Sequence, residues 1–528
     1  MYQRKETMKM KTMKRVLAIL LAGIMVLSTA ACGKTGENKN NDETVNNGGK
    51  EVLLKYWNAG NGDAWLKDLI KTFNAKQSDW NVVLEATASQ DGVKVAFGKE
   101  DIDEADLYNA PNGSADYQYL ETLDDLLEYT VDGENKTIGE KYDKAYLDIE
   151  KAADGHYYGL NVKLGSPGIV YNTKLFEKAG IDAAPRTTNE LVIACEKLLD
   201  AGVTPWIHFK SGGYLDRVVS LWWAQYDGYD YYRNNFSQLK VDGLTSKEVI
   251  MQKDGRFKAL EALEKVITKE TVLPGSNSYD HITSQTMFLN QEIGMMVNGT
   301  WLSNEMGDNL DDYRMMKTPV ISTITEKLET VKKDTDLRKV IEAIDAVTDG
   351  TAKEEDYKQG DQYMIDGLAV SEADWKYVKS ARTMAYSDST SVNFYIPKYA
   401  AEKEGAREFL KFVLSDEGIK ITQKYLHSKS ALTLSKGEID TSGWNEFEKS
   451  ALEVANAAEH LVIPVGNKTA HPVFSQYMTD GFAAVKYVAK FCAANDEDKE
   501  TAEEVWARIE QTFNKQWKQW MVTLDITE

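Results

Sequence analysis

DGHYYGLNVKLGSPGIVYNTKLFEKAGI, residues 154–181, is the stretch of this sequence that decides the fold. Its first part, 157–160, has the aromatic and apolar content of a strand. A break rich in glycine and proline, 165–168, separates it from a second apolar run, 169–171, which leads into a short helical segment ending at Gly180. Such a break between two strands indicates that the chain leaves one structural unit and starts another. The pattern predicts an α/β protein with a domain crossing here.

Length and charge limit the classes of protein that the chain can belong to. Its 528 residues suffice for two or more lobes with substantial cores. The net charge is −21, and the first 31 residues hold six Lys/Arg and one Glu, a net charge of +5. The remainder therefore carries −26, which is −21 minus +5. A strongly acidic body argues against nucleic acid and an anionic membrane surface as direct partners.

The N-terminus has the features of an export signal. Basic residues precede the uncharged run 16–27, which is short for a transmembrane helix, and small residues then lead to Cys32. This order resembles a bacterial lipobox, although Thr29 stands where Leu is usual. The resemblance implies a signal peptide over residues 1–31 and a lipid on Cys32. Plain secretory cleavage after one of the two alanines before Cys32 is the alternative.

Residues 32–50 are predicted to form a flexible tether. They contain one isolated aliphatic residue, Val45, and no aromatic residue, so they cannot bury enough surface to fold. A lipidated cysteine, a tether and a globular body are the layout of a receptor held at the outer face of a bacterial cytoplasmic membrane.

The two other cysteines, Cys195 and Cys492, lie in helical, largely apolar contexts. We expect buried free thiols at both positions. A disulfide between them is the alternative, because an exported body meets an oxidising environment. Neither has the spacing of a metal or redox motif, and the sequence predicts no metal and no cofactor.

Three stretches, taken in order, resemble the sugar-binding proteins of ABC importers, family 1 of the extracellular solute-binding proteins. The first is the crossing at 154–181. The second is QTMFLNQEIGMMVNGTW, 285–301, which is similar to the family signature F-x-x-G-x-x-A-M-x-x-x-G-x-W with departures at 290–294. The third, VNFYIPKYAAEKEGAREFLKFVLSDEG, 392–418, resembles the family's return strand and the helix after it.

The resemblance implies an α/β, two-lobed fold of the periplasmic-binding-protein type II, with a hinge and a ligand cleft between the lobes. The expected segments are lobe 1 over 51–162 and 393–430, lobe 2 over 163–392 and 431–528, a mostly helical insertion near 326–382, and hinges near 160–165 and 386–393.

Candidate ligand contacts of the first lobe lie on loops that follow predicted strands, where α/β sheets bind ligands. A buried strand over 51–57 and a later one over 105–108 are each followed by such a loop. The polar residues concerned are Asn58, Asn61, Asp63, Asn109 and Asn112. Their alternative role is turn formation, which Asn and Asp favour without any ligand.

A sugar receptor also needs flat apolar faces that stack on pyranose C–H surfaces. Trp301, in the second family stretch, is the main candidate. Further candidate ligand residues are the rings of Trp206, Tyr214, Trp222 and Phe474. The polar side chains of Lys163 and His208 are candidates as well. Core packing is the alternative for the rings, and a surface or structural role is the alternative for Lys163 and His208.

The resemblance implies a monomeric lipoprotein that captures a carbohydrate, specifically an oligosaccharide, and delivers it to the permease subunits of an ABC transporter. The sequence contains no Walker loop, HExxH, nucleophile elbow or zinc-spaced Cys/His set, so we expect no enzyme. Two alternatives stay open. One is a secreted carbohydrate-active enzyme, which would need two carboxylates at a fixed separation. The other is a sensor or scaffold lipoprotein of the same fold.

Overall fold

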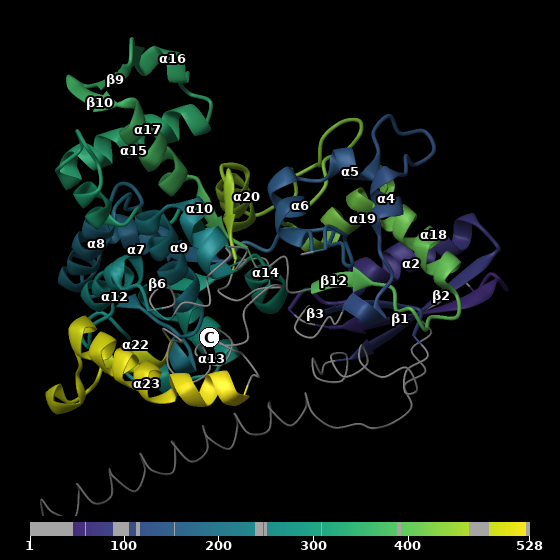
Figure 1. Ribbon diagram of the computed structural model, residues 1–528, viewed down its shortest axis with the longest axis horizontal. Coiled ribbons are helices and arrows are strands. Elements are labelled where there is room, and N and C mark those ends of the chain that lie inside the picture. The colour runs from purple at the N-terminus through teal and green to yellow at the C-terminus, as the bar shows by residue number, and fades with distance from the viewer. Residues whose placement is uncertain are drawn as a thin grey trace, which may run out of the picture. The chain divides into compact units, whose positions relative to one another are not determined.

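A computed structural model describes most of the globular body (Figure 1). The described residues are 46–58, 60–87, 105–111, 117–152, 154–237, 247, 251–307, 309–387, 392–463 and 485–523. The predictions for the signal peptide, Cys32, Asn112, Phe474 and most of the tether lie outside these residues. Within the described ranges, no helix is both long enough and apolar enough to cross a bilayer.

The first sheet is built mainly from the N-terminal part of the chain. Its order is β12-β3-β1-β2, and β1 pairs in parallel with both β2 and β3. The strands are β1 (Lys50–Trp57), β2 (Trp80–Thr87), β3 (Leu107–Pro111) and β12 (Val392–Tyr395). The helices of this part are α2 (Ala64–Lys76), α4 (Asp124–Glu128), α5 (Ile138–Lys141), α6 (Lys144–Glu150), α18 (Lys403–Val413) and α19 (Asp416–Leu426).

Alternate residues of β1 are buried and contribute to the core of this part. Val52, Leu54 and Tyr56 are buried on one face of the strand. Helix α2 places its apolar stripe in the same cluster, as does α18, where Phe409 meets Phe73 edge to face at 5.3 Å between ring centroids. The predicted strand over 51–57 is confirmed, and the strand predicted over 105–108 lies slightly later, as β3.

The second sheet has the order β5-β6-β4-β7, in which β5 and β6 are parallel and β4 runs antiparallel to both β6 and β7. Its strands are β4 (Gly168–Asn172), β5 (Thr204–Trp206), β6 (Ile293–Asn298) and β7 (Tyr313–Met316). Its helices are α7 (Thr173–Lys178), α8 (Thr188–Asp200), α9 (Leu215–Asp227), α10 (Tyr229–Tyr232), α12 (Asp254–Val266), α13 (His281–Asn290), α14 (Leu302–Met306), α20 (Glu446–Asn456), α22 (Val485–Phe491) and α23 (Ala502–Thr523).

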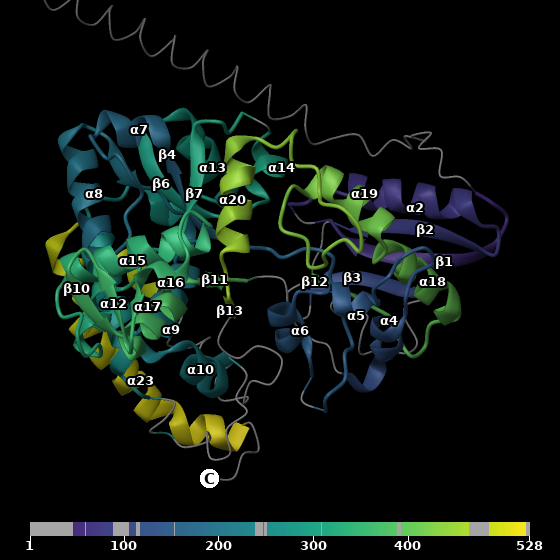
Figure 2. The same cartoon turned by 90° about the horizontal axis from the view of Figure 1, so that it is seen from above.

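Figure 2 shows α20 alongside β7, and Figure 1 shows the C-terminal helix α23 beside α12. The apolar stripe of α23 is buried in the core around the second sheet.

Each sheet holds one strand that opposes its neighbours, and that strand follows a chain crossing. β4 comes directly after the crossing from the first sheet to the second, and β12 is the returning strand, antiparallel to β3. The chain therefore passes from the first sheet to the second and later returns, and each sheet has its own hydrophobic core.

The first crossing differs locally from the prediction. Residues 157–160 do not form a strand; Leu160 makes one antiparallel bridge to Phe394. The Phe394 N–H donates to the Leu160 carbonyl at 2.8 Å. The aromatic content that suggested a strand serves side-chain contacts, because Tyr158 stacks on Tyr117 at 4.6 Å and donates to Asp154. The predicted helix after β4 is present, and Gly180 follows it at φ +67°.

The segment predicted as a mostly helical insertion contains helices and a small antiparallel sheet. The helices are α15 (Asp334–Thr348), α16 (Glu354–Tyr357) and α17 (Glu372–Arg382), and the strands are β8 (Lys358–Gln359), β9 (Gln362–Ile365) and β10 (Leu368–Ser371). Its apolar residues join the core of the second sheet. Arg382 pairs with Asp345 through two 2.8 Å hydrogen bonds, and together with Lys317 this guanidinium keeps the Asp345 pKa below its ordinary value despite burial.

A short parallel pair, β11 (Met384–Tyr386) and β13 (His460–Val462), completes the described strands. Ala431, Leu432 and Leu434 belong to the core of the first sheet, whereas the following helix α20 packs on β7. The exact lobe boundaries given by the sequence stay a prediction.

Both described cysteines are free. Cys195 is buried and accepts a hydrogen bond from the Trp206 indole at 3.2 Å, and Cys492 is half-buried. Burial raises the pKa of Cys195 to about 12, so the thiol stays protonated.

Candidate functional site

Polar side chains gather where the strands β1 and β3 of the first sheet end. The loop after β1 is held by Gly62, whose carbonyl accepts the Tyr56 hydroxyl at 2.7 Å and the Trp65 indole N–H at 3.2 Å. Burial raises the pKa of Tyr56 to about 12, which keeps its hydroxyl a donor. Gly62 has φ +63°, a conformation that a side chain would strain.

Three predicted ligand residues come together beside this loop. Asn61, Asn109 and Lys163 all line a small hollow of about 20 Å³. The Lys163 ammonium donates to the Asn61 side-chain oxygen at 2.5 Å. Asn109 is on β3 opposite Tyr56 of β1, because the two strands are parallel and in that register. The hollow thus combines amide groups and an ammonium with the neighbouring ring of Trp57.

The other two described candidates of this loop have different surroundings. Asn58 is exposed and donates its backbone N–H to Thr87 at 2.8 Å. Asp63 stands at the N-cap position of α2 without a side-chain cap bond, and its carboxylate lies 3.5 Å from the Lys67 ammonium. Neither lines the hollow.

The second sheet presents an aromatic ring directly after β6. All six residues of β6 are buried, and the chain turns sharply after Asn298, whose side-chain oxygen accepts the Gly299 N–H at 2.8 Å. Trp301 is half-buried at the start of α14. Its six-membered ring folds back over Gly299 so closely that a Cβ at residue 299 would overlap with it. The absence of a side chain at 299 therefore sets the position of the indole.

Neighbouring rings support Trp301. Tyr214 meets it edge to face at 5.4 Å between centroids, and Phe209 meets Tyr214 in the same way at 5.0 Å. The Arg217 guanidinium lies 3.8 Å from the Tyr214 ring centroid. Phe209 and Tyr214 follow β5, while Trp301 follows the parallel strand β6, so the cluster forms at the carboxyl end of two adjacent strands.

His208 directly precedes Phe209 of this aromatic cluster in the chain and is only 4% exposed. Its Nδ1 is 2.8 Å from the Phe209 carbonyl, and its buried Nε2 has no hydrogen-bond partner among the described residues. Burial lowers the pKa of this imidazole, so the neutral form is favoured. A donor Nδ1 leaves Nε2 as an acceptor.

Two of the predicted stacking residues are core residues instead. Trp206 is 2% exposed and bonds Cys195, and Trp222 is 1% exposed and donates to the Pro319 carbonyl at 3.0 Å. A ring enclosed on both faces cannot stack on a ligand, so we leave both out of the candidate site. The helical stripe of α9 explains the burial of Trp222, and pairing between β5 and β6 explains that of Trp206.

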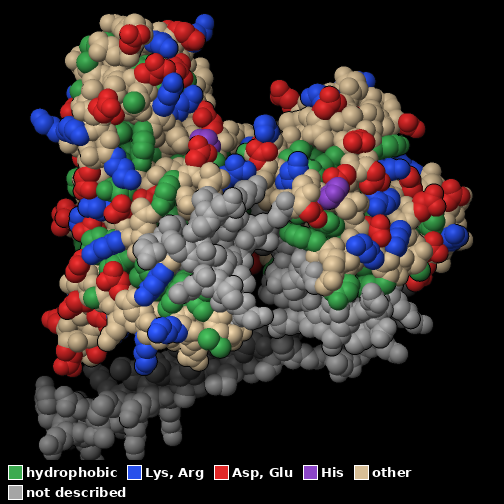
Figure 3. All heavy atoms as spheres, in the orientation of Figure 1, with side chains coloured by type: hydrophobic (Ala, Val, Ile, Leu, Met, Phe, Trp, Pro, Cys, Tyr) green, Lys and Arg blue, Asp and Glu red, His purple; other side chains and the backbone are tan. Residues whose placement is uncertain are grey.

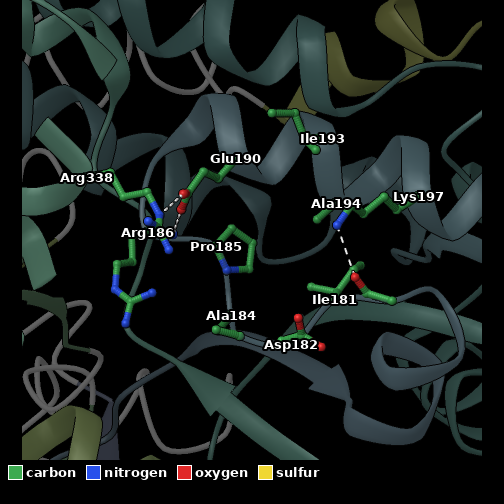
Figure 4. Close-up of a pocket in the computed structure, with 12 residues that line it drawn as sticks. Ile181, Asp182, Ala184, Pro185, Arg186, Glu190, Ile193, Ala194, Lys197 and Arg338 are labelled. Carbon is green, nitrogen blue, oxygen red and sulfur yellow. Dashed lines mark hydrogen bonds and ion pairs between the residues drawn. The ribbon is translucent and has the colours of Figure 1, made fainter. Parts of the chain in front are cut away.

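A separate hollow of about 280 Å³ lies between residues 180–186 and helix α8 (Figure 4). Two of its charged groups pair, with the Arg338 Nε 2.5 Å from Glu190 Oε1, and the Lys197 ammonium donates to the Gly180 carbonyl. No aromatic side chain lines it, and none of the predicted ligand residues does. It therefore lacks the stacking surface that the aromatic cluster offers.

In Figure 3, Lys and Arg side chains are interspersed among Asp and Glu over the visible face. Across the described ranges, no group of three or more His, Cys, Asp or Glu side chains could hold a metal ion.

Residues 57–420 match the family described as bacterial extracellular solute-binding protein. The chain belongs to this family.

Among curated sequences, this solute-binding protein resembles a Brucella abortus (strain 2308) binding protein and a Brucella suis biovar 1 (strain 1330) binding protein, each 27% identical over 161 residues. The match spans 30% of this chain and 37% of each relative's own length.

Solved structures cover far more of the solute-binding protein. The solute receptor AcbH, with a reported exclusive preference for β-D-galactopyranose, has a TM-score of 0.58 at 14% identity, over 89% of this chain and 99% of its own. Maltose-bound MalE3 of T. maritima has a TM-score of 0.55 at 15% identity, over 88% and 99%. A chitin oligosaccharide binding protein has a TM-score of 0.56 at 16% identity, over 89% and 99%. These likenesses confirm the predicted two-lobed α/β fold of type II.

Some residues of the site were not predicted from the sequence. Trp57 and Asn161 line the hollow of the first sheet, and Arg217 packs on Tyr214. Glu305 lies one helical turn after Trp301. The place of each residue in the sequence could have indicated it. Trp57 ends a strand, Asn161 belongs to the crossing, and Glu305 has helical spacing from Trp301.

Proposed function

We propose that this solute-binding protein captures a carbohydrate, specifically an oligosaccharide, and delivers it to the permease subunits of an ABC importer. The observation that carries the proposal is the pairing of two kinds of surface. One is the Trp301–Tyr214 ring cluster, and the other is the amide and ammonium hollow of Asn61, Asn109 and Lys163. Rings stack on pyranose faces, and planar amides and ammonium groups bond hydroxyls.

The solved neighbours support the same substrate class without fixing the sugar. Those cited above bind galactopyranose, maltose or chitin oligosaccharides. Family and neighbours are binding proteins, which supports a receptor that releases its ligand unchanged.

Calorimetric titration of the purified protein with neutral oligosaccharides tests the proposal. Xylotriose, maltotriose, raffinose and triacetylchitotriose form a suitable panel. A ligand at 100 times its dissociation constant should also raise the free energy of unfolding by about 2.7 kcal/mol. Saturable binding of one sugar without new reducing ends supports a receptor. New reducing ends would indicate an enzyme, and binding of peptides or polyamines alone would overturn the substrate class.

The proposed location is the outer face of the bacterial cytoplasmic membrane, where a lipid on Cys32 and the tether would hold a monomer near its permease. The lipobox-like order before Cys32 supports this location. Labelling with radioactive palmitate should modify the wild type and not Cys32→Ser. A wild-type protein that is released into the medium without label would favour plain secretory cleavage.

A further inference from the structure

Glu305 has the position of a ligand contact on the second sheet. It lies four residues after Trp301, and α14 begins directly after that ring. Residues four apart on a helix share one face, so the carboxylate lies on the Trp301 side of α14. The Glu305 side chain is half-buried, which leaves part of it accessible.

A buried amide orients the Glu305 carboxylate. Gln285, on α13, is 1% exposed, and its Nε2 donates to Glu305 Oε2 at 2.7 Å. A neutral amide bonds the carboxylate without cancelling its charge. No Lys, Arg or His lies within ion-pair distance of Glu305 in the described part of the chain. Gln285 thus fixes one oxygen, and no described Lys, Arg or His side chain compensates the negative charge.

The other oxygen, Glu305 Oε1, faces the polar loop of the first sheet. It lies so close to Gly60 that a Cβ there would overlap with it. Gly60 is next to Asn61, which bonds Lys163 in the amide hollow. The carboxylate therefore lies where the aromatic surface and the polar loop come together.

We propose that Glu305 determines ligand specificity by accepting hydrogen bonds from sugar hydroxyls beside the Trp301 ring. This inference rests on the proposed function and specifies its substrate class as a carbohydrate that is uncharged at this subsite. An O–H···O⁻ bond is about twice as strong as a neutral one. A sugar carboxylate placed there would meet a like charge, which selects against uronic acids.

Calorimetry with Glu305→Gln tests the inference, because this change keeps the side-chain shape and removes the charge. The probes are the four neutral oligosaccharides and trigalacturonate. Affinity for the neutral sugar that binds the wild type should fall about tenfold or more. The preference for that sugar over trigalacturonate should fall by at least as much. Glu196→Gln, on the exposed side of α8, removes the same charge elsewhere and should change neither value.

Gly60→Ala provides a second variant that retains Glu305. Its methyl group should displace the carboxylate and weaken neutral-sugar binding in the same way, whereas Gly443→Ala, with open space around residue 443, should have no effect. Wild-type binding together with unchanged affinity in both Glu305→Gln and Gly60→Ala would overturn the inference and leave the proposed function standing. Equal losses in Glu305→Gln and Glu196→Gln would also overturn it. A wild type that binds no sugar would overturn the proposed function itself.

Discussion

The indole ring of Trp301 lies directly over Gly299, two residues earlier in the chain, within the space that a side chain at 299 would occupy. This contact fixes the ring at the end of β6 without any hydrogen bond to its nitrogen among the described residues. The absence of a side chain at one residue thus decides the position of the main stacking surface.

Gly299→Ala should move the indole and weaken sugar binding about tenfold. The added methyl group overlaps with the ring, and extra volume at a tight contact costs about 1–3 kcal/mol of stability. Calorimetry and thermal melting measure the two effects. The matched control is Gly443→Ala, where nothing lies near the added methyl. Unchanged affinity in Gly299→Ala would show that the ring position does not matter for binding.

Trp301→Ala should lose binding and keep most of its stability. Stacking of an aromatic ring on a sugar face is worth about 1–3 kcal/mol, which corresponds to a loss of about ten- to hundredfold in affinity. Trp222→Ala is the matched comparison, because that ring is fully buried and its removal should cost about 3–5 kcal/mol of folding free energy. A large fall in the Trp301→Ala melting temperature with unchanged affinity would assign Trp301 to the core.

Lys163→Met should weaken binding about tenfold, because it removes the ammonium that holds Asn61 at 2.5 Å in the hollow of the first sheet. Lys174→Met is the control, since Lys174 is exposed and pairs with Asp312 away from this hollow. Affinity is measured by calorimetry with the sugar that binds the wild type. Equal affinities in both variants would remove Lys163 from the proposed contacts.

Stability should fall as the pH drops below 6.5. Burial lowers the pKa of both His208 and His460 from 6.5, so below that pH the unfolded chain binds protons that the folded protein does not. Well above pH 6.5 both imidazoles are neutral in both states and contribute no pH dependence. Denaturant unfolding between pH 7.5 and 5 measures the effect. The variant His208→Gln/His460→Gln should show a flatter profile, and an identical slope in the variant would contradict the assignment.

The sequence by itself determined several local elements of the fold, although residues 157–160 do not form the strand that it indicated. Period-two burial in β1, helical stripes in α2 and α23, and the break before β4 are local patterns that depend on residues close in the chain. The signature around Trp301 likewise identified a ring after a strand. Asn61, Asn109 and Lys163 could be proposed because strand ends are local features, and parallel pairing brings such ends together.

Only the tertiary structure decided which of the aromatic and polar candidates are enclosed. Trp206 is enclosed where β5 pairs with the distant strand β6, and the Trp222 indole donates to the Pro319 carbonyl, 97 residues away. Glu305 acquired its role through Gln285 and Gly60, which lie 20 and 245 residues away. Burial and long-range contacts depend on how sheets and helices pack, and a local pattern carries no information about that packing.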